Sequence, residues 1–228
     1  MTNLHLIIDC PAGNEKYAKS KRKDEFEECM KKNNSAKHIS HIHALGECAL
    51  PKELGELKKV TERKSGKRLS FREAILYAEE NIRGKGAVVI CNADIRMDHP
   101  TVAACVEIPR KTCWALARWN LDVTMRDGGV RRRRLTLQHN PERAQDAWVL
   151  PLPIPKGLHK YIDPSIQLGT PGCDNCIARI FRRIGFSVLN PCLSVIIVHV
   201  HEDWDRAVYN SSNVNFAVKH LCVPACEI

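Results

Sequence analysis

Asp9, Asp94, His199 and His201 each stand directly after, or one to three residues after, an apolar segment of the chain. A carboxylate supplies negative charge and a neutral imidazole supplies a borderline-soft nitrogen, a combination that suits a divalent transition ion such as manganese or zinc. Side chains two residues apart on a strand share a face, so His199 and His201 can point to one site. The alternative for each histidine is a structural role at the end of its strand. We predict a metal site that Asp94 shares with at least one of them.

A second candidate carboxylate, Asp174, follows a loop that contains Pro171 and Gly172. Such a loop would hold the carboxylate rigidly at the start of a helix. By spacing alone, helix capping explains Asp174 equally well. Asp98, followed by His99 and Pro100, is interpreted as a helix N-cap with proline in the first turn.

Common catalytic motifs are missing from the sequence. It contains no GxxxxGK[ST], no GxGxxG and no GxSxG pattern. Their absence argues against P-loop kinases, dinucleotide enzymes with the usual glycine fingerprint, and serine hydrolases.

The segments that precede the candidate residues have the patterns of strands and helices in an α/β domain. The run 87–91 is continuously apolar, as expected of a strand that helices cover on both faces. Ser70 and Glu73 form a capping-box pattern, which predicts a helix just before that strand. Short connections between helix and strand imply right-handed crossovers and a parallel sheet, where ligands gather beyond the carboxyl ends of the strands. Further expected elements are strands at 4–8, 39–45, 186–189 and 193–198 and helices at 24–32 and 174–183.

The segment Trp114–Trp119, the turn residues Asp127–Gly129 and an arginine-rich run that reaches Gln138 predict an antiparallel hairpin beside the sheet. The run includes Arg131–Arg134. The arginines allow a nucleic-acid interface. An exposed hairpin strand is the preferred interpretation, because no aromatic residue alternates with them. No internal repeat or linker is present, so we predict one α/β domain over 1–228, with a mainly parallel central sheet flanked by helices.

The 228 residues carry 35 Lys and Arg against 26 Asp and Glu, a net charge of +9, which favours anionic partners. Peripheral contact with an anionic membrane surface is one such option. No stretch reaches the roughly 18 apolar residues of a membrane span, and Asp9 interrupts any signal-peptide core. Eleven cysteines, an odd number, favour a reducing compartment, and we expect a cytoplasmic protein. Cys173-Cys176 and Cys222-Cys226 have poor spacing for structural zinc.

Several segments, taken in order, resemble the compact GT-A-type glycosyltransferase domains of bacteria and large algal viruses. They are Ser70–Glu73 with Val89–Ile95, Ala115–Trp119, Gln145–Trp148, Leu168–Asn175, Asn190-Pro191 and His199–His201. Each motif is weak alone, whereas together, in the same order, they are fairly specific. The resemblance implies a GT-A-like fold and a transferase that moves a sugar from a nucleotide-sugar donor to a glycan or another hydroxyl acceptor.

The resemblance also implies a divalent ion, commonly Mn²⁺ and alternatively Mg²⁺, at Asp94, where related enzymes carry an Asp-x-Asp motif. This chain has Asn92 at the first position of that motif, so only Asp94 supplies a charged ligand there. By position, the resemblance makes Arg118, Asp146, Asn92 and Asn175 sugar or acceptor contacts.

Asp174 is the candidate general base, which would take a proton from the acceptor hydroxyl. Two other function classes stay open. One is a basic nucleic-acid-binding module that uses Arg131–Arg134, although we expect no nucleic-acid partner. The other is a metal-dependent phosphodiesterase or nuclease built from Asp9, Asp94 and His199.

Overall fold

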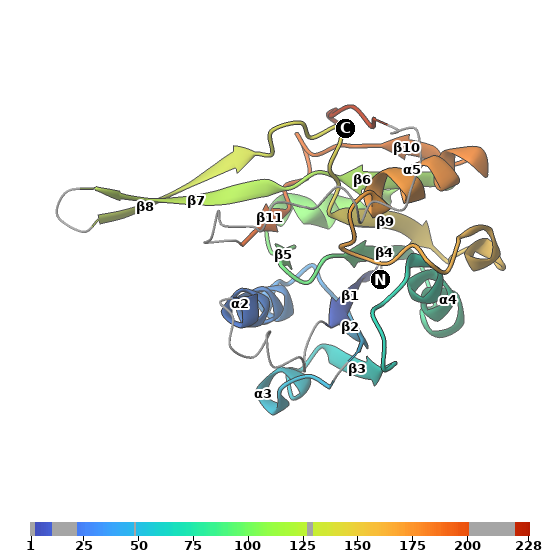
Figure 1. Ribbon diagram of the computed structural model, residues 1–228, viewed down its shortest axis with the longest axis horizontal. Coiled ribbons are helices and arrows are strands. Elements are labelled where there is room, and N and C mark those ends of the chain that lie inside the picture. The colour runs from blue at the N-terminus through green and yellow to red at the C-terminus, as the bar shows by residue number, and fades with distance from the viewer. Residues whose placement is uncertain (1–2, 11–21, 48, 127–129, 201–221) are drawn as a thin grey trace.

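The computed structural model describes residues 3–10, 22–47, 49–126, 130–200 and 222–228 (Figure 1). Seven of the described strands form a central sheet in the order β10-β6-β9-β4-β1-β2-β3. Their bounds are β1 Asn3–Cys10, β2 His41–Gly46, β3 Val60–Lys64, β4 Gly86–Cys91, β6 Thr112–Leu116, β9 Ala147–Leu152 and β10 Ser187–Leu189. All neighbours pair in parallel except β9, which is antiparallel to β4 and β6. The expected α/β fold with a mainly parallel central sheet is confirmed.

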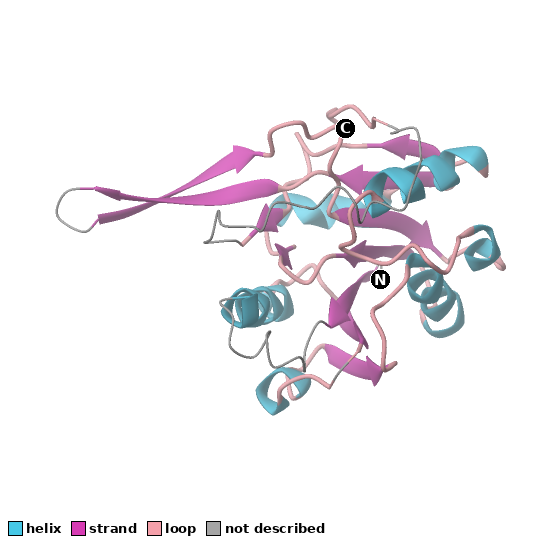
Figure 2. Cartoon of the chain, in the orientation of Figure 1, coloured by secondary structure: helices cyan, strands magenta, loops and turns pink. Residues whose placement is uncertain are grey.

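Helices cover both faces of this sheet (Figures 1 and 2). In the view of Figure 1, α4 and α5 lie on one side of the sheet and α2 lies on the other. The described helices are α2 Arg22–Ser35, α3 Lys52–Gly55, α4 Phe71–Asn81 and α5 Cys173–Arg183, with 3-10 helices η1 Pro100–Glu107 and η2 Leu158–Tyr161. None of them is long and apolar enough to cross a membrane.

The apolar runs of β1 and β4 are continuous because the side chains of each strand pack in two hydrophobic cores, one on each face of the sheet. Leu6 and Ile8 of β1 pack in the core on the α2 side, and Ile7 between them packs in the core on the α4 side. In β4, Val88 packs in the core on the α4 side and Val89 packs in the core on the α2 side. Successive side chains of a strand point to opposite faces, so a strand covered on both sides favours apolar residues at consecutive positions. Each such side chain stabilises the fold by about 1.5–3 kcal/mol.

The predicted capping box at the start of α4 is confirmed. The Ser70 hydroxyl accepts from the Glu73 amide at 3.2 Å, and the Glu73 carboxylate accepts from the Ser70 amide at 3.2 Å. The first helical residue, Phe71, then packs edge-on against Trp148 of β9, with ring centroids 4.7 Å apart. This contact fixes α4 on the sheet.

A smaller sheet has the order β5-β11-β7-β8, with β5 Ile95–Arg96, β7 Trp119–Arg126, β8 Val130–Leu137 and β11 Val198–His199. An antiparallel hairpin of β7 and β8 is present, and it extends away from the central sheet (Figure 1). Its first strand begins only at Trp119, and residues 114–116, predicted to belong to the hairpin, lie in β6 of the central sheet. The hairpin turn, Asp127–Gly129, lies outside the described residues.

Two other local predictions are wrong. The sequence predicts a strand over 193–198, but the Val195 amide donates to the Pro191 carbonyl at 2.8 Å, so a turn occupies the first half of this run and only Val198 lies in a strand, β11. An apolar run alone does not distinguish a buried turn from a strand. The N-cap of η1 is His99, whose Nδ1 accepts from the Thr101 amide at 3.4 Å, and Asp98 pairs with Arg96 instead.

All ten described cysteines are free thiols. Cys91, Cys105 and Cys113 are buried, and burial raises the pKa of each thiol. Within the described ranges, no group of three or more His, Cys, Asp or Glu side chains is placed to hold a metal ion.

Candidate functional site

A cleft of about 440 Å³ opens at the carboxyl ends of β1 and β4. This is the edge at which ligands gather in α/β sheets. Helix α2 contributes Glu25 and Phe26 to its wall, and the loop before α5 contributes 168–172. The candidate residues that line it are Asp9, Asn92, Asp94, Arg118, Asp146 and Asp174.

Asp94 and His199 form a pair at this cleft. The Asp94 Oδ2 and His199 Nε2 atoms lie 3.2 Å apart, although the two residues are 105 positions apart in sequence. Strands β5 and β11 cause this proximity, since Ile95 pairs with His199 in an antiparallel register. The His199 side chain is 4% exposed and the Asp94 side chain 32% exposed, so the carboxylate is the partner that reaches solvent. His201 lies outside the described residues.

Asn92, Asp146 and Arg118 form a second group. Arg118 Nη1 donates to Asp146 Oδ1 at 2.9 Å, and the Asn92 side-chain amide donates to the same oxygen at 3.2 Å. The Arg118 and Asp146 side chains are 17% and 8% exposed, so the ion pair is largely shielded from water. Asn92 Oδ1 and Asp146 Oδ2 are buried and have no hydrogen-bond partner among the described residues. Buried acceptors in this state are typical of places where a ligand or ordered water binds.

Asp174 stands in the first turn of α5, as predicted, but it is not the N-cap. That position is Gly172, whose φ of 79° is in the left-handed region that suits glycine. Asp174 Oδ1 accepts from the Asn175 amide at 2.9 Å, and Oδ2 accepts from the Gln145 amide at 3.4 Å. Burial, the largest influence, raises the pKa of Asp174. The carboxylate is therefore both fixed in position and a stronger base than a solvated aspartate.

Asn175 is not among the residues that line the cleft, although it was predicted to contact substrate. Its side-chain amide donates to Asp174 Oδ1 at 3.3 Å and to the Arg143 carbonyl at 3.5 Å. The structure thus places Asn175 behind Asp174, where it supports the carboxylate.

Asp9 and Arg68 form the cleft wall at the end of β1. Asp9 Oδ1 accepts from the Leu69 amide at 3.1 Å, and Arg68 Nε lies 3.7 Å from Asp9 Oδ2. Burial outweighs these contacts and raises the pKa of Asp9 to about 6. Sequence analysis missed Arg68, because it lies in a charged stretch, 52–68, that has no clear pattern. Its Nη2 reaches the Gly169 carbonyl at 3.4 Å, a contact over 101 positions that has no local signal.

No protein-family model matches the chain, and no curated protein matches its sequence. Solved structures do match. One is GalNAc-T7 with UDP, GalNAc and Mn²⁺, at 11% identity and a TM-score of 0.55, over 89% of this chain and 44% of that chain. This chain therefore spans less than half the length of that protein.

A second match is 4-diphosphocytidyl-2C-methyl-D-erythritol synthase from Anaerococcus prevotii. It has 10% identity and a TM-score of 0.50, over 89% of this chain and 92% of that chain. Together with the mixed sheet and its helical layers, these similarities define a GT-A-like fold.

Proposed function

We propose that this chain is a glycosyltransferase that moves a sugar from a nucleotide-sugar donor to an acceptor hydroxyl with the help of a divalent ion. One observation carries the proposal. Asp94, the buried acceptors of Asn92 and Asp146, and the fixed carboxylate of Asp174 all line one cleft at the carboxyl edge of a GT-A-like sheet, and His199 contacts Asp94 from behind the cleft wall.

The donor set of Asp94 and His199 fits an ion that is shared with a substrate. Two protein ligands are too few for a closed structural site, and the described residues offer no third. Mn²⁺ and Mg²⁺ bind in this way, with one or two protein ligands and the oxygens of a phosphate group completing the shell. When bound here, such an ion would stabilise the negative charge that develops on a leaving diphosphate. The UDP and Mn²⁺ in the GalNAc-T7 structure support this assignment.

Arg118 would act on the leaving diphosphate, and Asp174 would act on the acceptor hydroxyl. As the bond between the anomeric carbon and the diphosphate breaks, its electron pair goes to the diphosphate oxygen. Arg118 lines the cleft, and its guanidinium, whose charge Asp146 compensates in part, would favour this anion by hydrogen bonding. The acceptor oxygen forms the new bond to the anomeric carbon, and Asp174 takes its proton.

Nucleotidyl transfer is the second candidate, and one observation favours it. The match to the cytidylyl-type synthase covers 89% of this chain and 92% of that chain. The products separate the two reactions. Nucleotidyl transfer from a nucleoside triphosphate releases pyrophosphate, and sugar transfer releases a nucleoside diphosphate.

A thermal-shift screen tests which ligand class binds. The screen uses nucleoside diphosphates, nucleotide sugars and nucleoside triphosphates, each with Mn²⁺, with Mg²⁺ and with EDTA. A ligand at 100 times its Kd stabilises the folded state by about 2.7 kcal/mol. We expect a rise in Tm with nucleotide sugars that requires the metal. A rise with triphosphates alone would favour nucleotidyl transfer.

A further inference from the structure

Strand β5 directly follows Asp94 in sequence and lies at the edge of the smaller sheet. Strand β5 pairs with β11 on one side, and no described strand pairs with its other side. The Val200 amide donates to the Asp94 carbonyl at 3.1 Å, so Asp94 is tied to the β11 side through its backbone. The outer backbone groups of residues 95 and 97 need other partners.

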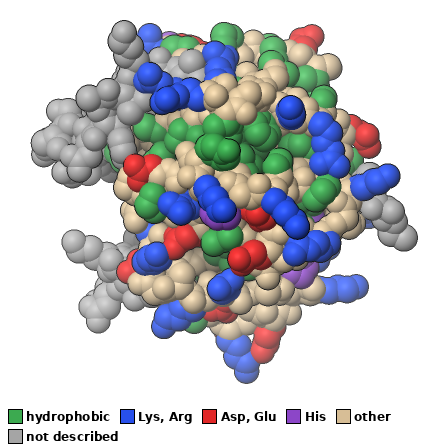
Figure 3. All heavy atoms as spheres, turned by 90° about the vertical axis from the view of Figure 1, so that its right-hand side faces the viewer, with side chains coloured by type: hydrophobic (Ala, Val, Ile, Leu, Met, Phe, Trp, Pro, Cys, Tyr) green, Lys and Arg blue, Asp and Glu red, His purple; other side chains and the backbone are tan. Residues whose placement is uncertain are grey.

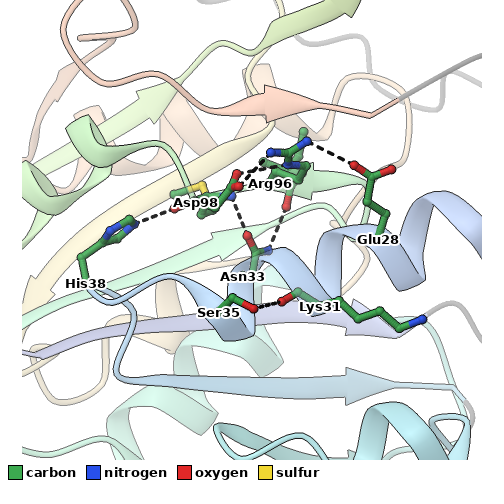
Figure 4. Close-up of polar contacts among 9 residues, drawn as sticks. Glu28, Lys31, Asn33, Ser35, His38, Arg96 and Asp98 are labelled. Carbon is green, nitrogen blue, oxygen red and sulfur yellow. Dashed lines mark hydrogen bonds and ion pairs between the residues drawn. The ribbon is translucent and has the colours of Figure 1, made fainter.

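Asn33 of α2 supplies those partners. Its side-chain amide donates to the Ile95 carbonyl at 3.1 Å, and its Oδ1 accepts from the Met97 amide at 2.7 Å. This is the pair of hydrogen bonds that a neighbouring strand would make to residues 95 and 97. Asn33 is 2% exposed, and the His38 ring completes the edge by contacting the Met97 carbonyl at 2.7 Å (Figure 4).

Arg96 holds the same segment on α2 through charge. Its Nη1 donates to Glu28 at 3.1 Å, and its Nε and Nη2 donate to both oxygens of Asp98, at 3.1 and 2.8 Å (Figure 4). The Arg96 side chain is 16% exposed, and these carboxylates raise the pKa of its guanidinium. Bidentate geometry of this kind fixes orientation as well as distance. We call Glu28, Asn33, Arg96 and Asp98 the α2 clamp.

Helix α2 also lines the cleft with Glu25 and Phe26. Helix α2 therefore contacts both the cleft and the outer edge of β5. From this arrangement we infer that the α2 clamp, with Asn33 as its central residue, is the positioning device that keeps Asp94 in register with His199. The inference rests on the proposed function, since it assigns the clamp to the metal-binding pair. Asn33 is a positioning residue and has no catalytic role.

The test compares Asn33→Asp with a matched control. Asp keeps the size and the acceptor oxygen of Asn but loses the donor to Ile95, and its charge is repelled by that carbonyl. The control is Asn34→Asp, on the same helix, because Asn34 Oδ1 accepts from the Lys59 amide at 3.1 Å, away from β5. Urea unfolding measures the loss of stability in both variants.

Two measurements report on the Asp94 end of the site. The first is Mn²⁺ affinity, by electron paramagnetic resonance of the free ion. We expect Asn33→Asp to weaken it by about 10- to 100-fold, as for residues that orient metal ligands, and Asn34→Asp to leave it within about twofold. The second is hydrogen exchange of the Val200 amide in metal-free protein, which should speed up in Asn33→Asp alone.

Unchanged Mn²⁺ affinity in folded Asn33→Asp, or equal losses in both variants, would overturn the inference. If the wild-type protein binds no Mn²⁺, the metal assignment fails, and Val200 exchange alone decides whether the clamp positions Asp94. If Asn33→Asp does not fold, Glu28→Gln takes its place. It removes the charge at the more exposed end of the clamp and should change both measurements in the same direction, and no change would overturn the inference.

Discussion

The acidic residues of the cleft differ in how their charges are compensated. Asp146 has an arginine at 2.9 Å, whereas the donors to Asp174 among the described residues are amides. Asp9 has the Leu69 amide and a more distant Arg68, and burial raises its pKa to about 6. The pKa of Asp174 is also raised by burial. These environments give the carboxylates different roles. Asp146, paired with an arginine, is a fixed negative charge, and Asp174, whose pKa is raised, is a proton acceptor.

Asp174→Asn tests the proton acceptor. Asn keeps the size and one acceptor oxygen, so we expect stability to fall by only about 1 kcal/mol. Loss of the base should lower kcat for sugar transfer by about 10²- to 10⁴-fold and leave donor binding nearly unchanged. Steady-state kinetics and urea unfolding measure both effects. Asp163→Asn, at an exposed aspartate that accepts from Ser165, is the control. Full activity of a folded Asp174→Asn variant would exclude Asp174 as the base.

A histidine group on β1 and β2 predicts loss of stability in acid. His43 Nε2 lies 3.1 Å from His5 Nδ1, and its Nδ1 lies 3.0 Å from the Tyr77 hydroxyl. Burial lowers the pKa of His43 to about 3, and it lowers the pKa values of His5 and His41 as well. The unfolded chain titrates near 6.5, so below that pH it binds more protons than the folded chain, and folding stability falls as pH falls.

Urea unfolding at pH 7.5 and pH 5 measures this effect in the wild type and in His43→Gln. Between these pH values we expect the wild type to lose about 2 kcal/mol more than the variant. The raised pKa of Asp9 makes folding stability rise as pH falls through the same range, but this effect is present in both proteins and cancels in the comparison. An equal loss in both proteins would contradict the assignment to His43.

At the scale of elements, different kinds of contact hold the elements of the fold in place. Packing of Phe71 on Trp148 fixes α4, and hydrogen bonds from Asn33 fix β5. The β7–β8 hairpin extends away from the central sheet and carries Arg131–Arg134 along β8 (Figure 1). The hairpin is therefore the element that the nucleic-acid alternative requires.

Replacing Arg131–Arg134 by glutamine tests that alternative. We expect the wild-type protein to bind a single-stranded oligonucleotide more weakly than about 100 μM at physiological salt, because aromatic residues for base stacking are missing from this segment. Fluorescence anisotropy over a series of salt concentrations measures the affinity. Tight binding with a steep salt dependence, lost in the variant, would support a nucleic-acid-binding module.

At the scale of the whole molecule, sequence patterns predicted the elements whose signals are local. Hydrophobic runs revealed β1 and β4, and the Ser70 pattern revealed α4. Strand β9, Ala147–Leu152, was not predicted, and its antiparallel direction depends on tertiary pairing and not on the apolar run itself. The same holds for Asn33, whose two partners lie 62 and 64 positions away. Asp94 and His199 were predictable as strand-end residues, but the two-residue strand that brings them together was not.

The net charge of +9 is a property of the whole molecule too. Figure 3 shows the face that carries α4 and α5, where Lys and Arg side chains are spread among acidic and apolar ones. A dispersed distribution on this face favours solubility and weak attraction of anions over a dedicated nucleic-acid surface there.

The most direct test of the central claim is a transfer assay with the nucleotide sugar that the thermal-shift screen selects. The assay measures release of nucleoside diphosphate and the mass of the acceptor, with and without acceptor and with Mn²⁺ or EDTA. We predict release that requires both Mn²⁺ and acceptor, an acceptor mass increased by one sugar residue, and loss of both signals in Asp94→Asn. Release of nucleotide at the same rate without acceptor would indicate hydrolysis, as in a phosphodiesterase, and would contradict sugar transfer.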